Sequence, residues 1–203
     1  FNNFDAATTF LRNLNRSVLL RTHIRDGGFF ALNNVPQEIT YGSTYYDKGA
    51  LVVHALRNYM GDSLFFKSIR RFLKEYAFQN VNSINFINEL SQYSGIDLSD
   101  FYAAWINQAG FLHFSIDSIV YKGNDNQYAV HISQDLYGAE NLGNNNIIDV
   151  SFFSNNNEIY TTSFRFSGKY GIANLNIPFQ PAFGAIDYYE KLPDATIDYN
   201  NLI

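Results

Sequence analysis

Two adjacent tyrosines, Tyr45 and Tyr46, stand directly before a long apolar stretch, and they are the side chains whose type and position best suit chemistry. A tyrosine phenol is neutral at pH 7 because its unperturbed pKa is about 10, so it donates a hydrogen bond without carrying a charge. A buried phenol at a helix start would direct its O–H at one fixed point. The residues alone leave a second interpretation open, because adjacent tyrosines at a helix start also serve as packing residues.

The sequence does not predict a metal site. The four histidines are His23, His54, His113 and His131, and no two of them lie within one helical turn. The pattern His-Glu-x-x-His does not occur, whereas a zinc site needs three or four converging ligands and usually starts from a close pair. We therefore interpret His54, in the middle of the apolar stretch, as a core histidine with one hydrogen-bond partner.

Other catalytic and binding patterns are also missing from the sequence. The chain has no cysteine, no Gly-x-Ser-x-Gly and no glycine-rich phosphate loop. Asp97 and Asp100 are interpreted as helix-capping residues because they are three positions apart. A formal net charge of −5 over 203 residues argues against nucleic acid as a partner, since that binding needs a basic patch. No apolar run approaches the roughly 18 residues that a membrane span requires.

The first half of the chain has the period of helices. Apolar residues at helical spacing predict a first helix that runs to about Arg21 and is broken at 26–28. The helix after Tyr46 is apolar on nearly all sides over residues 50–56, which predicts a central position. Three further helices are expected, one capped by Asp62, one opened by Ser83 and one capped by Asp97, with stops at Gly61, Gly95 and Gly110.

Two of these helices have a predicted buried face. Basic residues between Lys67 and Lys74 are expected to form a solvated face, and Trp105 is expected to be buried near the end of the helical half. The stripe expected to face the core of the helix after Asp62 consists of Phe65, Ile69, Phe72, Leu73 and Tyr76.

From Leu112 onward the hydrophobic period changes to two, which is typical of strands. We expect six or seven short strands, including 113–120, 128–133, 147–153, 159–166, 172–177 and 182–188. The predicted fold class is therefore α+β in two parts. A helical, bundle-like segment at 1–111 is followed by an antiparallel β-sandwich at 112–203.

Motifs between Pro36 and Gly110 resemble, in order, segments of the M1 family of zinc aminopeptidases. Each motif is weak alone, whereas the ordered set is fairly specific. The family often continues with a β-sandwich domain, which agrees with the second half of the chain. The motifs are Pro36-Gln37-Glu38-Ile39 followed by Tyr46-Asp47-Lys48-Gly49-Ala50, then Gly61-Asp62 with Phe65 or Phe66, and finally Ser94-Gly95-Ile96-Asp97-Leu98 followed by Phe101, Trp105, Gln108 and Gly110.

The resemblance implies a catalytic role for Tyr46. In the family, the tyrosine of Tyr-x-Lys-Gly donates a hydrogen bond to the oxyanion of the tetrahedral intermediate, and only Tyr46 holds that position. Lys48 and Gly49 are assigned structural roles, and Gly49 is expected to let its helix approach a neighbour closely. The resemblance also implies zinc as the cofactor of a full-length parent protein and a peptide as its substrate.

Motifs that the family places ahead of this segment are absent, namely His-Glu-x-x-His, the third ligand Glu and Gly-x-Met-Glu-Asn. We therefore expect the C-terminal part of a peptidase catalytic domain, which binds no zinc, is inactive alone and has the upstream zinc-binding part of the same protein as its partner. Some apolar surface of the helical half should then be exposed. The alternative is a non-catalytic M1-like scaffold or a protein- or carbohydrate-interaction module.

Overall fold

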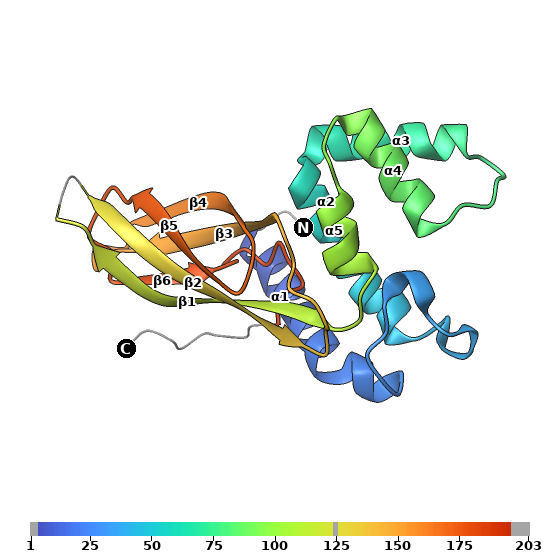
Figure 1. Ribbon diagram of the computed structural model, residues 1–203, viewed down its shortest axis with the longest axis horizontal. Coiled ribbons are helices and arrows are strands. Elements are labelled where there is room, and N and C mark those ends of the chain that lie inside the picture. Colours follow the sequence, from blue (N-terminus) through green and yellow to red (C-terminus); the bar gives the residue numbers. More distant parts are fainter. Residues whose placement is uncertain (1–3, 124–125, 196–203) are drawn as a thin grey trace.

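The computed structural model of the protein describes residues 4–123 and 126–195, and Figure 1 shows most of the helices at one end and two sheets at the other. No helix in this described part is long and apolar enough to cross a membrane. The α-helices are α1 (Phe4–Arg25), α2 (Gly49–Met60), α3 (Asp62–Glu75), α4 (Ser83–Ser94) and α5 (Ser99–Phe101). Short 3₁₀ and π-helical turns are η1 (Leu32–Asn34), η2 (Gln37–Ile39), η3 (Thr44–Lys48) and η4 (Tyr102–Ile106).

The predicted helix boundaries are confirmed at Ser83 and Gly95, whereas the predicted capping by Asp62 is wrong. Gly95 ends α4 with φ 73°, a left-handed conformation that favours glycine. The N-cap of α4 is Asn82, whose side chain accepts the N–H of Asn85, so Ser83 is the first helical residue. Asp62 likewise lies inside α3 and forms an ion pair with Arg57 at 2.7 Å instead of capping the helix.

The buried face of α3 differs from the predicted stripe at two positions. Phe65 and Phe72 are buried, whereas Leu73 is 64% exposed and Ser68 is buried. Helix α3 packs against α2 and α4, and successive residues of a helix point about 100° apart, so the residue after Phe72 turns away from both neighbours. The basic residues of this helix are exposed, as predicted.

The second half forms two antiparallel sheets of three strands each, which confirms the predicted α+β fold class. One sheet has the order β1-β2-β5 and the other the order β4-β3-β6. The division into 1–111 and 112–203 stays a prediction. The strands are β1 (Phe111–Tyr121), β2 (Gln127–Tyr137), β3 (Asn146–Phe153), β4 (Ile159–Phe166), β5 (Tyr170–Asn176) and β6 (Phe183–Ile186).

One apolar core runs through both halves. Its helical members include Leu56 and Leu90, and its strand members include Phe114 and Phe152, all of them fully or almost fully buried. Trp105 is 1% exposed and belongs to the same core, which confirms its predicted burial. Because the apolar contacts are continuous, the helices and the sandwich stabilise each other.

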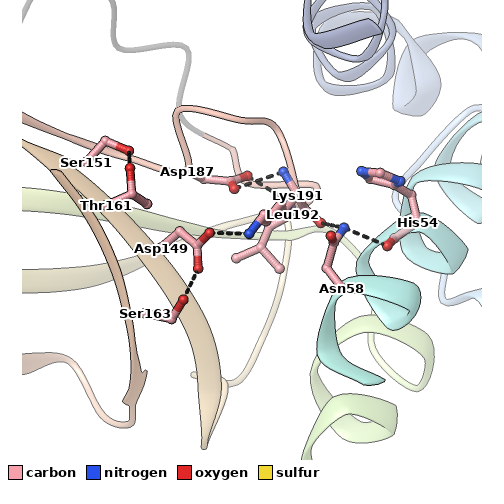
Figure 2. A network of polar contacts seen from close by, with 9 residues as sticks. All are labelled: His54, Asn58, Asp149, Ser151, Thr161, Ser163, Asp187, Lys191 and Leu192. Atoms are coloured by element: carbon pink, nitrogen blue, oxygen red, sulfur yellow. Dashed lines mark hydrogen bonds and ion pairs between the residues drawn. The ribbon is translucent and has the colours of Figure 1, made fainter. Parts of the chain in front are cut away.

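The segment 187–195, called the strap below, connects the sandwich to the helices (Figure 2). The N–H of Asp187 donates to the carbonyl of Asp149 on β3 at 2.9 Å, and Lys191 Nζ lies 2.5 Å from the Asp149 carboxylate. The carbonyl of Lys191 accepts a bond from Asn58 Nδ2 on α2 at 3.4 Å. The strap therefore bridges β3 and α2.

Helix α1 is attached to the same strap. Arg12 Nε donates to Glu190 at 2.9 Å, and Asn15 Nδ2 donates to the carbonyl of Asp194 at 3.2 Å. Burial raises the pKa of Glu190 above its usual value, and the nearby Arg12 opposes that shift. These contacts hold α1 against the C-terminal part of the described chain although the two are far apart in sequence.

Candidate functional site

Tyr45 and Tyr46 lie on η3, a single π-helical turn that leads directly into α2. The N–H of Gly49 donates to the carbonyl of Thr44, five residues back, where an α-helix would use a step of four. Such wide turns are rare and frequently occur at functional sites. The π-helical turn therefore points both tyrosine side chains in directions that a continuous α-helix leading into α2 would not give them.

A buried aspartate fixes the start of η3. Asp26, directly after α1, accepts the N–H of Ser43 at 3.0 Å and that of Thr44 at 2.6 Å through its two carboxylate oxygens. Gly42 is required for this approach, because a Cβ there would lie 2.6 Å from Asp26 Oδ1. The sequence predicts Asp26 only as part of a helix break. Local capping rules span a few residues, and Asp26 acts on groups 17 and 18 positions away.

A buried lysine fixes the end of η3. The side chain of Lys48 donates to the carbonyl of Gly110 at 2.8 Å and to that of Phe30 at 3.4 Å, and Lys48 is only 2% exposed. Its ammonium lies 4.9 Å from the centre of the Phe111 ring. Burial lowers the pKa of Lys48 to about 8 because a low-dielectric surrounding disfavours the charged amine. Lys48 thus has the structural role that the sequence predicted.

The two tyrosines themselves reach the surface. Tyr46 is 58% exposed and Tyr45 is 51% exposed, so the expected burial of a phenol is wrong for this chain. The Tyr46 ring stacks on that of Tyr41 with centroids 6.5 Å apart and an angle of 18° between the planes. Because the backbone of η3 is held at both ends, Tyr46 combines a fixed attachment with an accessible hydroxyl.

Gly49 does not have the role that was expected for it. A Cβ built at this position would meet Leu32 and the Thr44 carbonyl only at 3.9 Å, an ordinary van der Waals distance. The prediction of a close approach at Gly49 is therefore wrong, and a small side chain would fit there.

The histidines do not form a metal centre. Within residues 4–123 and 126–195, no group of three or more His, Asp or Glu side chains is arranged to hold an ion. His23 stacks on Phe29, His113 lies 3.7 Å from Asp194, and His54 lies on α2 at the edge of the strap (Figure 2). Burial lowers the pKa of His54, and the neighbouring Arg57 contributes to that shift. The residues described here do not fit a zinc ion, which needs three or four converging ligands.

Asp97 and Asp100 act separately. The predicted capping by Asp97 is wrong, because the N-cap of α5 is Leu98. Asp97 instead accepts the N–H of Ser99 at 2.9 Å from one position further back, and the hydroxyl and N–H of Ser99 lower its pKa. Asp100 accepts a bond from Asn145 Nδ2 at 2.5 Å. The pair is therefore used for local structure and for a contact with the loop before β3.

Residues 31–105, which include η3, α2, α3, α4 and α5, match the sequence profile described as the Peptidase family M1 domain. This segment, called the M1 segment below, is similar in sequence to peptidase family M1. The M1 segment contains Tyr46 and Lys48. Phe30 and Gly110, whose carbonyls accept the bonds from Lys48, lie outside the matched residues.

Individual relatives match a similar stretch. The chain is 35% identical over 71 residues to "Probable M1 family aminopeptidase 1" of Encephalitozoon cuniculi and 33% identical over 66 residues to "Aminopeptidase N" of Lactococcus lactis subsp. lactis. These matches cover 35% and 32% of this chain, and 8% of each relative. The chain therefore matches only a small part of the length of these proteins.

The fold similarity extends further than the sequence similarity. The crystal structure of Legionella pneumophila aminopeptidase A in complex with aspartic acid superposes on 97% of this chain with a TM-score of 0.68. The sequence identity is 18%, and the superposed region is 23% of that protein. The M1 segment and the sandwich that follows it thus share their arrangement with a larger aminopeptidase.

Proposed function

We propose that this chain works as part of a zinc-dependent aminopeptidase of family M1, which hydrolyses N-terminal residues from peptides, and that Tyr46 is its oxyanion-stabilising residue. The observation that carries the proposal is the exposed Tyr46 on a π-helical turn held at both ends, by Asp26 and by Lys48. The M1 match over residues 31–105 supports the reaction class.

The chemistry asked of Tyr46 is that of a placed donor. When a peptide carbonyl is attacked, negative charge develops on its oxygen only in the transition state, and a phenol O–H already aimed at that oxygen stabilises it without reorganisation. Asp26 and Lys48 reduce the freedom of the backbone that carries Tyr46, which is the condition for such preorganisation. Neither of them touches the substrate in this proposal, so both are positioning residues.

The remaining machinery is assigned to another part of the same protein. The described residues lack a converging ligand set, and we propose that the chain alone holds no zinc and is inactive. Apolar side chains on α1, η3 and α2, three elements that pack together, are exposed and suit a covering partner. These side chains are Leu20, Ile24, Tyr45 and Val53. We propose the zinc-binding part as that partner.

The test compares Tyr46→Phe and Tyr45→Phe in the full-length protein. Loss of one oxyanion donor typically lowers kcat by about 10²–10³. Tyr46→Phe should show this loss with an unchanged melting temperature, because the ring and its stacking on Tyr41 are kept. Tyr45→Phe is the matched control, with the same chemical change at a neighbouring exposed residue, and should leave kcat within a few-fold.

Two outcomes would contradict the proposal. Near-full kcat in Tyr46→Phe would remove the catalytic assignment of that residue. A full-length protein that hydrolyses no aminoacyl substrate, with zinc supplied, would instead favour the non-catalytic M1-like scaffold. The isolated chain provides a further check, since stoichiometric zinc retained after dialysis would contradict the assignment of the metal to another part.

A further inference from the structure

The sandwich has a cleft of about 680 Å³ between β1 and the turn that leads into β6. It lies toward the β1–β2 hairpin, at the end of the sandwich away from α2–α5 (Figure 1). This volume falls within the roughly 300–1,000 Å³ that is typical of small-molecule sites. The side chains that matter for its chemistry are Asp117, Ser118, Tyr121, Asn126, Gln180 and Phe183.

A β-bulge in β1 shapes one wall of the cleft. The pairing with β2 passes from Ile116 opposite Ile132 to Ser118 opposite His131, so Asp117 is an extra residue in the ladder. Bulges change the direction of side chains and occur often beside sites. Here two consecutive polar residues, Asp117 and Ser118, are both exposed, whereas a regular strand would place them on opposite faces.

The carboxylate of Asp117 is held in place by the strand next to it. Its Oδ1 accepts a bond from the hydroxyl of Ser133 at 2.8 Å, and the Ser133 hydroxyl also lies 2.9 Å from that of Ser115. Ser133 is buried, so this support is protected from solvent. The carboxylate is thereby fixed with one oxygen engaged.

Aromatic rings supply the apolar part of the cleft. Tyr121 is 56% exposed, and its ring lies 5.3 Å from that of the buried Tyr128. Phe183 stacks on Phe153 with centroids 4.5 Å apart and an angle of 14° between the planes. Each ring on the cleft is therefore supported by a second ring behind or beside it, and little side-chain freedom is left to lose on binding.

These features select among ligand classes. The described lining residues include no lysine, arginine or histidine, so an anionic ligand would find no matching charge. An extended peptide that added to the edge of β1 would need a regular ladder, which the bulge at Asp117 interrupts. A neutral ligand with many hydroxyls fits better. Its hydroxyls match the amides, the hydroxyl and the carboxylate, and its C–H faces match the aromatic rings.

We propose that this cleft is a binding site for a neutral saccharide. The site is independent of the proposed peptidase chemistry, because it shares no residue with η3 and lies at the other end of the molecule. Its function would be recognition of glycan, either free or attached to another molecule.

The experiment titrates the purified chain with short neutral oligosaccharides of glucose and of N-acetylglucosamine, followed by ligand-observed NMR and calorimetry. At least one of them should bind saturably. Tyr121→Ala should weaken that binding about tenfold or more, because it removes a supported ring from the site. Tyr170→Ala is the matched control, since Tyr170 is an exposed tyrosine of β5 outside the cleft. This variant should bind the oligosaccharide with the same affinity as the unchanged protein.

A second substitution keeps the test valid if Tyr121→Ala unfolds. Ser118→Arg places a bulky side chain at an exposed position of the bulge, where the fold should tolerate it, and it should abolish binding by filling the cleft. Absence of saturable binding by every oligosaccharide would overturn the proposal. So would binding that Tyr121→Ala and Ser118→Arg leave unchanged, or an extended peptide that binds in the cleft when no saccharide does.

Discussion

The buried amine of Lys48 makes the stability of this protein depend on pH in an unusual window. The folded chain holds the Lys48 proton only up to about pH 8, because burial lowers its pKa from the ordinary 10.5. The unfolded chain holds it up to about 10.5. Between these two values the unfolded state binds more protons, so the free energy of unfolding rises with pH.

The size of this effect follows from the difference between the two pKa values. Multiplying the difference between 10.5 and about 8 by about 1.36 kcal/mol gives roughly 3.4 kcal/mol for the whole window. About 2 kcal/mol of this gain falls between pH 7 and pH 9.5, which avoids strongly alkaline solutions. For a chain of this size, that corresponds to a rise of about 4–8 °C in Tm.

The variant Lys48→Met isolates the contribution of this one amine. Methionine keeps most of the apolar stem but removes the donor to the carbonyls of Gly110 and Phe30, which costs about 1–3 kcal/mol at any pH. Tyrosines and other lysines titrate in both proteins and cancel when the two are subtracted. The difference in unfolding free energy, wild type minus variant, should therefore grow by about 2 kcal/mol from pH 7 to pH 9.5.

Urea unfolding at a series of pH values measures this difference. Fluorescence of Trp105 is a suitable signal, because it is the single tryptophan of the chain and is 1% exposed in the folded state. A difference that stays flat from pH 7 to pH 9.5 would show that Lys48 titrates normally and would refute the argument. If Lys48→Met does not fold, NMR titration of the lysine side chains in the unchanged protein gives the same answer directly.

Two further substitutions test the supports of η3 and of the first strand. Asp26→Ala removes the acceptor of two backbone N–H groups, so it should lower the free energy of unfolding by about 1–3 kcal/mol. Urea titrations measure this loss, and an unchanged free energy of unfolding would show that water replaces the carboxylate. Gly110→Ala should be far more destabilising than Gly61→Ala, although both glycines have a positive φ. Melting curves that gave the two variants equal losses of stability would contradict this prediction. A Cβ at Gly110 would lie 2.1 Å from the backbone of Gly138, whereas a Cβ at Gly61 would meet nothing within 4 Å.

Local periodicity predicted most of the elements of this fold. The change from helical spacing to alternation near Leu112 was sufficient to place the helices first and the strands second, and each predicted strand has a counterpart in the structure. The errors arose where a neighbour decided the outcome. Leu73 has the apolar character of a core residue, but α3 packs only on the side of Phe65 and Phe72, so Leu73 stays exposed.

The candidate site was only partly predictable for the same reason. The motif around Tyr46 drew attention to the tyrosine and to Lys48, because short motifs are local in sequence. The role of Asp26 depends on a contact across 17 positions, and the partner of Lys48 is the carbonyl of Gly110, 62 positions away. Neither separation leaves a pattern in a single sequence, since any acidic residue or any carbonyl could be the partner until the fold brings them together.

These long contacts give the sandwich a part in positioning Tyr46. The loop after β2 contains Gly138, and Gly110 packs against its backbone so closely that only glycine fits. The carbonyl of Gly110 then receives the Lys48 amine, and Lys48 ends the π-helical turn that holds Tyr46. Rigid elements position a reacting group better than loops do. The sandwich therefore does more than follow the M1 segment in sequence, because the packing of the loop after β2 against Gly110 helps to fix the backbone of the proposed oxyanion donor.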